Sequence, residues 1–374
     1  MKLRFTILSL FLLLSLSVVT FGQSDDLQFF GYFQNNFTHY YLHLNGARPS
    51  TLWAADSYVM QQMNLFAAKN FGPQFTSFVN MEITNSLSSK DNYGAIKVEE
   101  AWLKYEPSGL FNVKFGLLIP RFNNFNEIKN RTVLLPYIYR PIAYETVFSS
   151  YFNIEEYVPQ QAYLQIAGTI PVGGDVRFNY AGFMGNLQSD QLIKNTSQYA
   201  IANDSSKYKM YGGRIGAEYG NLALGVSGTI DHKNYWNYGI GYVPRTRLGA
   251  YLNYSFAGFD FESEYIKVSY TVSDGQEAVL KSVASSPKAF DKVYFHWNLL
   301  YNVSDQLFAY AGYDYVHSQD LPFSTGGVHQ YNFGAGYKVN TNIVIKGQFN
   351  TQNSMAFATP LLRQDWLFGA SIYF

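Results

Sequence analysis

The chain ends on DWLFGASIYF, residues 365–374, in which apolar side chains alternate with small or polar ones. Because successive side chains of a β-strand point to opposite faces, this segment would present one apolar and one mixed face. The apolar face would carry Trp366, Phe368, Ala370, Ile372 and Phe374, and the other face Leu367, Gly369, Ser371 and Tyr373. The pattern favours a strand between lipid and a wetter interior. An ordinary soluble strand shows the same alternation, so the rest of the chain must decide.

The first 22 residues have the features of a secretory signal peptide. Lys2 and Arg4 precede an apolar stretch at residues 7–19, and the small residues Thr20 and Gly22 follow it. We expect cleavage near Gly22, since this stretch is short for a membrane-spanning helix and no stop-transfer pattern follows. The chain contains no cysteine, which excludes a lipid anchor at the cleavage site, disulfide bonds and thiolate metal sites.

Composition points away from a soluble protein. Aromatic residues make up 18% of the chain and charged residues 14%, against about 25% charged in typical soluble domains. Beyond the first 22 residues no apolar run is long enough for a transmembrane helix, whereas a β-barrel needs only every second residue to face lipid. The 27 basic and 27 acidic residues balance, so nothing indicates a nucleic-acid partner.

Strand-like segments of about ten residues recur and are joined alternately by short turns and longer polar loops. The short turns are expected at Gly72-Pro73, Pro107-Ser108-Gly109, Val172-Gly173-Gly174, Gly220-Asn221, Ala257-Gly258, Ser304-Asp305 and Asn340-Thr341-Asn342. The longer loops are expected at residues 40–56, 87–94, 121–159, 187–206, 232–244, 272–289, 318–328 and 352–364. Seven turns and eight loops predict an all-β fold, a transmembrane antiparallel β-barrel of about 16 strands, formed by residues 23–374 as a single domain. A soluble sandwich or propeller is the alternative.

Three segments fit the alternation poorly. Residues 27–39 and 58–70 have a blurred pattern, and residues 259–270 change phase near Ser263 or Lys267. We interpret the phase change as a β-bulge.

The loop at residues 121–159 is the longest and is unusually apolar. It contains Phe122, Phe125, Leu134, Leu135, Pro136, Tyr137, Tyr139, Pro141 and Tyr144. A loop of this length in a compact protein is usually functional, and a sixteen-stranded lumen is wide enough to accept it. We therefore expect the loop to fold inward and form the constriction of a pore. The alternative is an external loop packed on its neighbours or on another subunit.

The stretch VEEAWLKYEPSGLFNVKFGLLIPRFNNFNEIKNRTVLLPYIYRPIAYE, residues 98–145, resembles the corresponding region of outer-membrane porins of the phosphate-selective porin O/P type. Phe115, Gly116 and Pro120 match an F-G-x-x-x-P-like element that precedes the third loop in such porins. The matching loop residues are Asn126, Glu127, Arg140, Pro141 and Glu145. The resemblance implies sixteen strands, an inward third loop, passive diffusion and often trimers. It covers about an eighth of the chain.

Selectivity of a pore depends on the side chains that line its lumen. By alternation four arginines point inward as a basic arc: Arg177, Arg214, Arg245 and Arg247. The loop adds constriction charges at Glu127, Arg131, Arg140, Glu145, Glu155 and Glu156. Guanidinium groups bind carboxylate and phosphate oxygens, so the arc would attract anionic solutes; structural ion pairing within a polar wall is the alternative for each residue. Lysines do not dominate the lumen, so phosphate specificity is not predicted.

The pattern as a whole predicts an outer-membrane porin, a water-filled pore for passive diffusion of ions and small hydrophilic solutes. A carrier of hydrophobic compounds and a closed structural barrel are the alternatives. An enzyme is not expected, because the six histidines are scattered and no catalytic motif is present. His317 and His329 flank one loop, but solvated histidines explain them without a metal. We expect no cofactor and no metal; the expected partners are small hydrophilic or anionic solutes, outer-membrane lipid and a homotrimer.

Overall fold

The computed structural model describes residues 27–44, 50–84, 95–131, 135–145, 154–187, 206–234, 241–283, 291–318, 327–354 and 361–374. The expected signal peptide lies outside these residues, as do parts of several expected loops. No helix within the described ranges is both long and apolar enough to cross a membrane.

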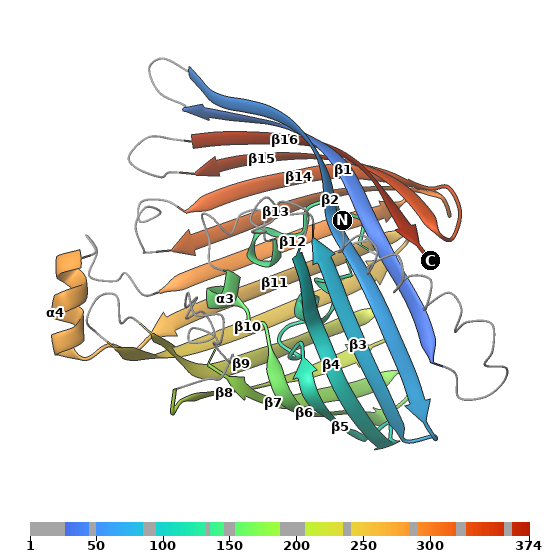
Figure 1. Ribbon diagram of the computed structural model, residues 1–374, viewed down its shortest axis with the longest axis vertical. Helices are drawn as coiled ribbons and strands as arrows, with labels where there is room; N and C mark the ends of the chain where they lie inside the picture. The colour runs from blue at the N-terminus through green and yellow to red at the C-terminus, as the bar shows by residue number, and fades with distance from the viewer. Residues whose placement is uncertain are drawn as a thin grey trace, which may run out of the picture.

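The chain forms a closed antiparallel barrel in which each strand pairs with its neighbours in sequence and β1 pairs with β16 (Figure 1). The strands are β1 (Gln28–Leu44), β2 (Ser50–Phe71), β3 (Phe75–Thr84), β4 (Ala95–Ser108), β5 (Phe111–Leu118), β6 (Ala162–Gly173), β7 (Val176–Asn186), β8 (Lys209–Tyr219), β9 (Leu222–Asn234), β10 (Tyr242–Phe256), β11 (Phe259–Tyr270), β12 (Lys292–Asn302), β13 (Leu307–Ser318), β14 (Val328–Lys338), β15 (Ile343–Ser354) and β16 (Leu361–Tyr373). The predicted fold class and strand number are confirmed.

All seven predicted short turns connect strands at the expected places. Several use left-handed backbone that favours glycine, such as Gly72 (φ 74°) and Gly220 (φ 55°). The boundaries of the first long loop were wrong, because β1 continues to Leu44 and β2 begins at Ser50. Among the described residues, four helical segments lie outside the strands: α2 (Phe125–Ile128), the 3₁₀ helix η1 (Ile142–Tyr144), α3 (Ile154–Tyr157) and α4 (Asp274–Val283). Figure 1 shows α4 beyond the ends of the strands.

The alternation predicted for the last strand is present in β16. Trp366, Phe368 and Phe374 are exposed on the outer face, whereas Leu367 and Ser371 are fully buried on the inner face. Outward apolar side chains recur on the other strands, among them Phe115, Ile215, Val226, Leu248 and Ile345. This outer apolar surface is what a barrel presents to lipid.

The irregular segments have different causes. The blurred pattern of β1 and β2 coincides with a register shift between Gln34 and Asn35. The predicted bulge in β11 was wrong, because β11 pairs without a shift along both neighbouring strands. Its inward side carries Glu262 and Glu264 followed by Ile266 and Val268, both fully buried. The change in polarity along that face reflects what the strand packs against inside the barrel.

Closure of the barrel depends on a tight seam between β1 and β16. Gly31 and Phe374 exchange two backbone hydrogen bonds of 2.9 and 3.0 Å. A Cβ at position 31 would lie 2.6 Å from the carbonyl oxygen of Asn64 and 2.8 Å from the Phe374 ring. The seam therefore has no room for a side chain at this position.

We predict that Gly31→Ala destabilises the folded barrel by about 1–3 kcal/mol, the usual cost of overpacking. The temperature at which the folded band disappears in unheated-versus-heated gel electrophoresis should fall. Gly347→Ala is the matched control, since its nearest neighbours would be ring atoms of Phe368 at 3.7 Å. Equal transition temperatures for the two variants would contradict the prediction.

Candidate functional site

The described parts of the connection between β5 and β6, residues 119–131, 135–145 and 154–161, fold into the barrel, as expected from its apolar character. The loop residues Phe122, Ile138, Ile142 and Val158 are completely buried, although they belong to no strand. In Figure 1 the α3 turn lies inside the ring of strands. The loop thus occupies part of the space that would otherwise be an open lumen.

A hydrophobic core inside the barrel holds the loop against one part of the wall. The wall supplies inward residues of β11 to β14, including Ile266, Tyr294 and Tyr310. Aromatic contacts join the two sides, with ring centroids 5.2 Å apart for Tyr137 and Tyr310 and 6.1 Å apart for Tyr144 and Tyr294. Both pairs meet edge to face, the favourable arrangement for aromatic rings. The loop is therefore packed like a core segment.

Strand carboxylates accept hydrogen bonds from the loop. Glu264 on β11 accepts the backbone N–H groups of Asn124 and Phe125 at 2.8 and 2.7 Å and the Tyr144 hydroxyl at 2.5 Å. Glu262 accepts the Tyr137 hydroxyl. Glu262 also accepts a hydrogen bond of 3.0 Å from Asn298 on β12, so it joins the loop to the wall.

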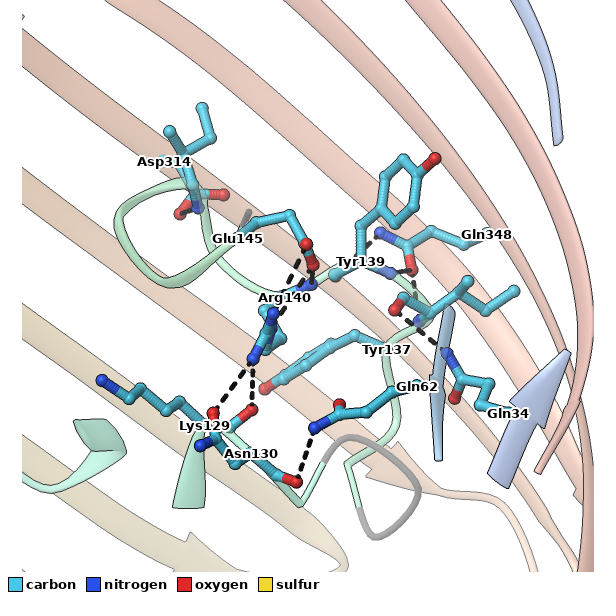
Figure 2. Close-up of polar contacts among 12 residues, drawn as sticks. Gln34, Gln62, Lys129, Asn130, Tyr137, Tyr139, Arg140, Glu145, Asp314 and Gln348 are labelled. Carbon is cyan, nitrogen blue, oxygen red and sulfur yellow. Dashed lines mark hydrogen bonds and ion pairs between the residues drawn. The ribbon is translucent and has the colours of Figure 1, made fainter. Parts of the chain in front are cut away.

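Asp314 on β13 accepts the backbone N–H of Ile142 at 3.2 Å, so a third strand carboxylate holds the loop. Amide side chains from β15 and β1 hold its middle. Gln348 on β15 accepts the N–H groups of Ile138 and Tyr139 at 2.6 and 3.0 Å, and Gln34 on β1 donates to the Ile138 carbonyl at 3.2 Å. Figure 2 shows Gln34 and Gln348 beside the loop segment that carries Tyr139. The loop is thus held by strands β11, β13, β15 and β1.

Arg140 and Glu145, both predicted constriction residues, brace the loop internally (Figure 2). Both are buried; the Arg140 backbone N–H donates to Glu145 at 3.0 Å, and its guanidinium donates to the Lys129 carbonyl at 2.8 Å. Burial opposes charge on Arg140, but Glu145 and Glu82 raise the pKa of its guanidinium above the ordinary value. The charges of Arg140 and Glu145 therefore stabilise the loop and are not presented to solvent.

Glu127 brings two arginines together at the beginning of the loop. Its carboxylate lies 2.8 Å from Arg121 Nε and 3.2 Å from Arg214 Nη1 on β8. Burial opposes ionisation, yet the two guanidinium groups hold the pKa of Glu127 below its ordinary value. Arg121 and Glu127 remain about a quarter exposed, at 26% and 28%. Two cations therefore share one anion at a partly exposed edge of the loop.

Arg245 and Arg247 face inward, as alternation predicted, but they form a buried ion-pair cluster. Asp231 on β9 accepts from Arg245 at 2.7 and 2.6 Å and from Arg247 at 2.9 Å. Arg247 also donates to the backbone carbonyl of Glu156 at 2.9 Å, and the Glu156 carboxylate pairs with Lys233 and Lys292. Sequence analysis did not find Asp231, because its place opposite Arg245 depends on the register between β9 and β10.

The remaining predicted site residues lie apart from these groups. Arg177 on β7 is exposed near the short turn that follows β6 and stands opposite Glu218 in the register. Arg131 is exposed in the loop. Glu155 lies in α3, and its side chain is outside the described part of the structure. The four arginines thus do not form one continuous arc. Across the described ranges no three histidine or acidic side chains are grouped so that they could hold a metal ion.

No model of a known protein family matches the sequence, and a search of curated proteins finds no match. Solved structures do match. An anion-selective porin from Comamonas acidovorans superposes with a TM-score of 0.60 at 11% identity, over 93% of this chain and 99% of that one. OprB of Pseudomonas putida gives 0.56 at 11% identity, over 92% and 94%. OmpT, an outer membrane protein of Vibrio cholerae, gives 0.54 at 13% identity, over 95% and 100%.

At such identities the likeness concerns the fold, which is the barrel fold of these outer-membrane proteins. A closed barrel with an apolar outer surface and a polar interior is built for that membrane. The chain is an outer-membrane β-barrel protein. The more specific resemblance to phosphate-selective porins stays a prediction.

The buried Lys129 of the loop should make the stability of the folded protein depend on pH. Its ammonium donates to Gln160 at 2.6 Å, and burial, only partly offset by Glu99, lowers its pKa from 10.5 to about 7. Unfolding then takes up a proton between these two pH values, so stability should rise with pH across this window, by about 1.4 kcal/mol per unit of pKa difference at most.

We predict that Lys129→Met flattens this rise. The measurement is the urea midpoint of the detergent-solubilised protein at several pH values between neutral and pH 10. Lys69→Met, on β2, is the control and should keep the wild-type slope. An unchanged slope in Lys129→Met would show that Lys129 is not the titrating group.

Proposed function

We propose that this protein is an outer-membrane diffusion porin, a water-filled pore for ions and small hydrophilic solutes narrowed by the loop of residues 121–159. The observation that carries the proposal is a long loop docked across the interior of a closed barrel, by contacts to β8 and β9 and, on the opposite part of the wall, to β1 and β2. The loop also keeps the charged groups of Arg121 and Glu127 partly exposed, which a closed structural barrel would not need. The fold shared with an anion-selective porin supports the same function.

The alternative of a hydrophobic carrier has less support. It would use an open apolar cavity, whereas the apolar side chains of the loop are buried against Ile266, Tyr294 and Tyr310 of the wall. The groups left partly exposed beside the loop are charged, namely Arg121 and Glu127. Charged groups suit a passage for hydrated solutes.

The experiment is single-channel recording of the refolded mature protein in planar bilayers. Ohmic steps of constant size would support the porin, and a barrel that inserts without conducting would refute it. Under a salt gradient, the reversal potential should indicate a preference for anions, because Arg121 and Arg214 share the single carboxylate of Glu127.

We predict that Arg214→Gln shifts the reversal potential toward cations, since Glu127 would then lose one of the two guanidinium groups that contact it. Lys69→Gln removes the same charge from β2 and should leave the reversal potential unchanged. Equal reversal potentials for the wild type and Arg214→Gln would exclude this charge group from selectivity. Arg247 is completely buried, so its substitution would test stability and not selectivity.

We also propose that the protein assembles as a homotrimer. The outer face of β1 and β2 carries Asn35, Asp56 and Tyr58, the last two 64% and 86% exposed. An amide and a carboxylate are costly against lipid and better suited to contact with another chain. OmpT of Vibrio cholerae, which has a similar fold, is described in a trimer form. Cross-linking in mild detergent should give a three-chain species, and a monomer only would contradict the proposal.

A further inference from the structure

Asn123, near the beginning of the loop, is fixed to the barrel wall at β9. It is completely buried, and its φ of 49° lies in the left-handed region, which asparagine tolerates better than most residues. Its backbone N–H donates to Ser227 Oγ on β9 at 3.1 Å, and the Ser227 hydroxyl donates back to Asn123 Oδ1 at 2.6 Å. Backbone and side chain are therefore held by the same wall residue.

A notch in the wall receives the Asn123 side chain. The notch is formed by Gly249 on β10, which stands opposite Ser227 in the register. A Cβ at position 249 would lie 2.2 Å from Asn123 Oδ1 and 2.6 Å from Ser227 Oγ. Gly249 lies within a regular strand and its φ is not left-handed, so glycine is needed here for space and not for backbone conformation.

Asn123 also positions the charges at the edge of the loop. Its backbone carbonyl accepts a hydrogen bond of 2.6 Å from Arg214 Nη1. The same nitrogen lies 3.2 Å from Glu127, which in turn contacts Arg121. A displacement of Asn123 would therefore move both the loop and the guanidinium group that faces Glu127.

We propose that Asn123, seated in the notch at Gly249, is the positioning residue of the constriction. It sets how far the loop stands from the wall and where the Arg214 and Glu127 charges lie. The proposal rests on the proposed function, because it assigns the loop's docking point to the selectivity of a pore. Asn123 itself need not touch the solute.

The test compares two glycine-to-alanine variants on neighbouring strands. Gly249→Ala fills the notch and should push the loop into the passage, with lower single-channel conductance and a shifted reversal potential. Gly228→Ala, on β9, adds the same methyl group where its nearest neighbours would be at 3.6 Å, and should behave as the wild type. Identical conductance and reversal potential in the two variants would overturn the proposal.

A second variant keeps the test decisive if Gly249→Ala does not fold. Asn123→Gly tolerates the left-handed backbone but removes the side chain, so the channel should become noisier and more conductive. Wild-type recordings from Asn123→Gly would overturn the proposal.

Trypsin cleavage after Arg131 measures docking independently of conductance. Asn123→Gly should be cut in the loop faster than Gly228→Ala, because the loop would leave the wall more often. If the wild type forms no channel, the proposed function fails, while the cleavage rates still decide whether Asn123 docks the loop. Equal cleavage rates would exclude that role.

Discussion

Pairing of the backbone around a closed sheet is the constraint on which the rest of this structure depends. In hydrocarbon an unpaired N–H or C=O costs several kcal/mol, so the first and last strands must meet, as they do through Gly31 and Phe374. Closure of sixteen strands creates an interior too wide to be filled by wall side chains alone. The long third loop fills part of this interior. Its apolar residues could not remain in water, and the lumen is the place within the molecule that needs to be filled.

The inner wall is accordingly divided into two kinds of surface. Where the loop packs, the inward positions carry Ile266, Val268 and tyrosines, together with carboxylates that accept backbone N–H groups. Glu264 accepts hydrogen bonds from two loop amides and a hydroxyl, so its buried carboxyl group has hydrogen-bond partners without a cation. On β4 and β5 the wall is charged and less buried, with Lys104 paired to Glu106 and Lys114 over the Trp102 ring. The loop thus covers one part of the wall and leaves another to water.

Sequence alone was sufficient for the features that repeat locally. Turn residues located all seven short connections, and alternation assigned the faces of β16 and the inward direction of Arg245 and Arg247. The same rule failed where the loop packs on the wall. There the inward residues Ile266 and Val268 are apolar because they belong to the core that includes the loop, and their apolar character suggested a phase change that the strand register does not have. Contacts between distant parts of the chain could not be predicted from the sequence for another reason. Asp231 meets Arg245 through strand register, and Asn123 meets Gly249 across 126 positions of chain, which no local pattern specifies.

Burial separates the charges that hold this barrel together from those that a solute could sense. A guanidinium group removed from water must be fully paired to be tolerated, and Arg245 and Arg247 meet that requirement through Asp231 and the Glu156 carbonyl. Once paired and enclosed, they contribute little field to the passage. At Glu127 the positive charges are in excess, because one carboxylate is shared by the guanidinium groups of Arg121 and Arg214, and this carboxylate stays partly exposed to solvent. An incomplete neutralisation of this kind persists only where water can solvate the excess charge. The preference of the proposed pore therefore depends less on how many arginines face inward than on which charged groups, here Arg121 and Glu127, stay partly exposed to solvent.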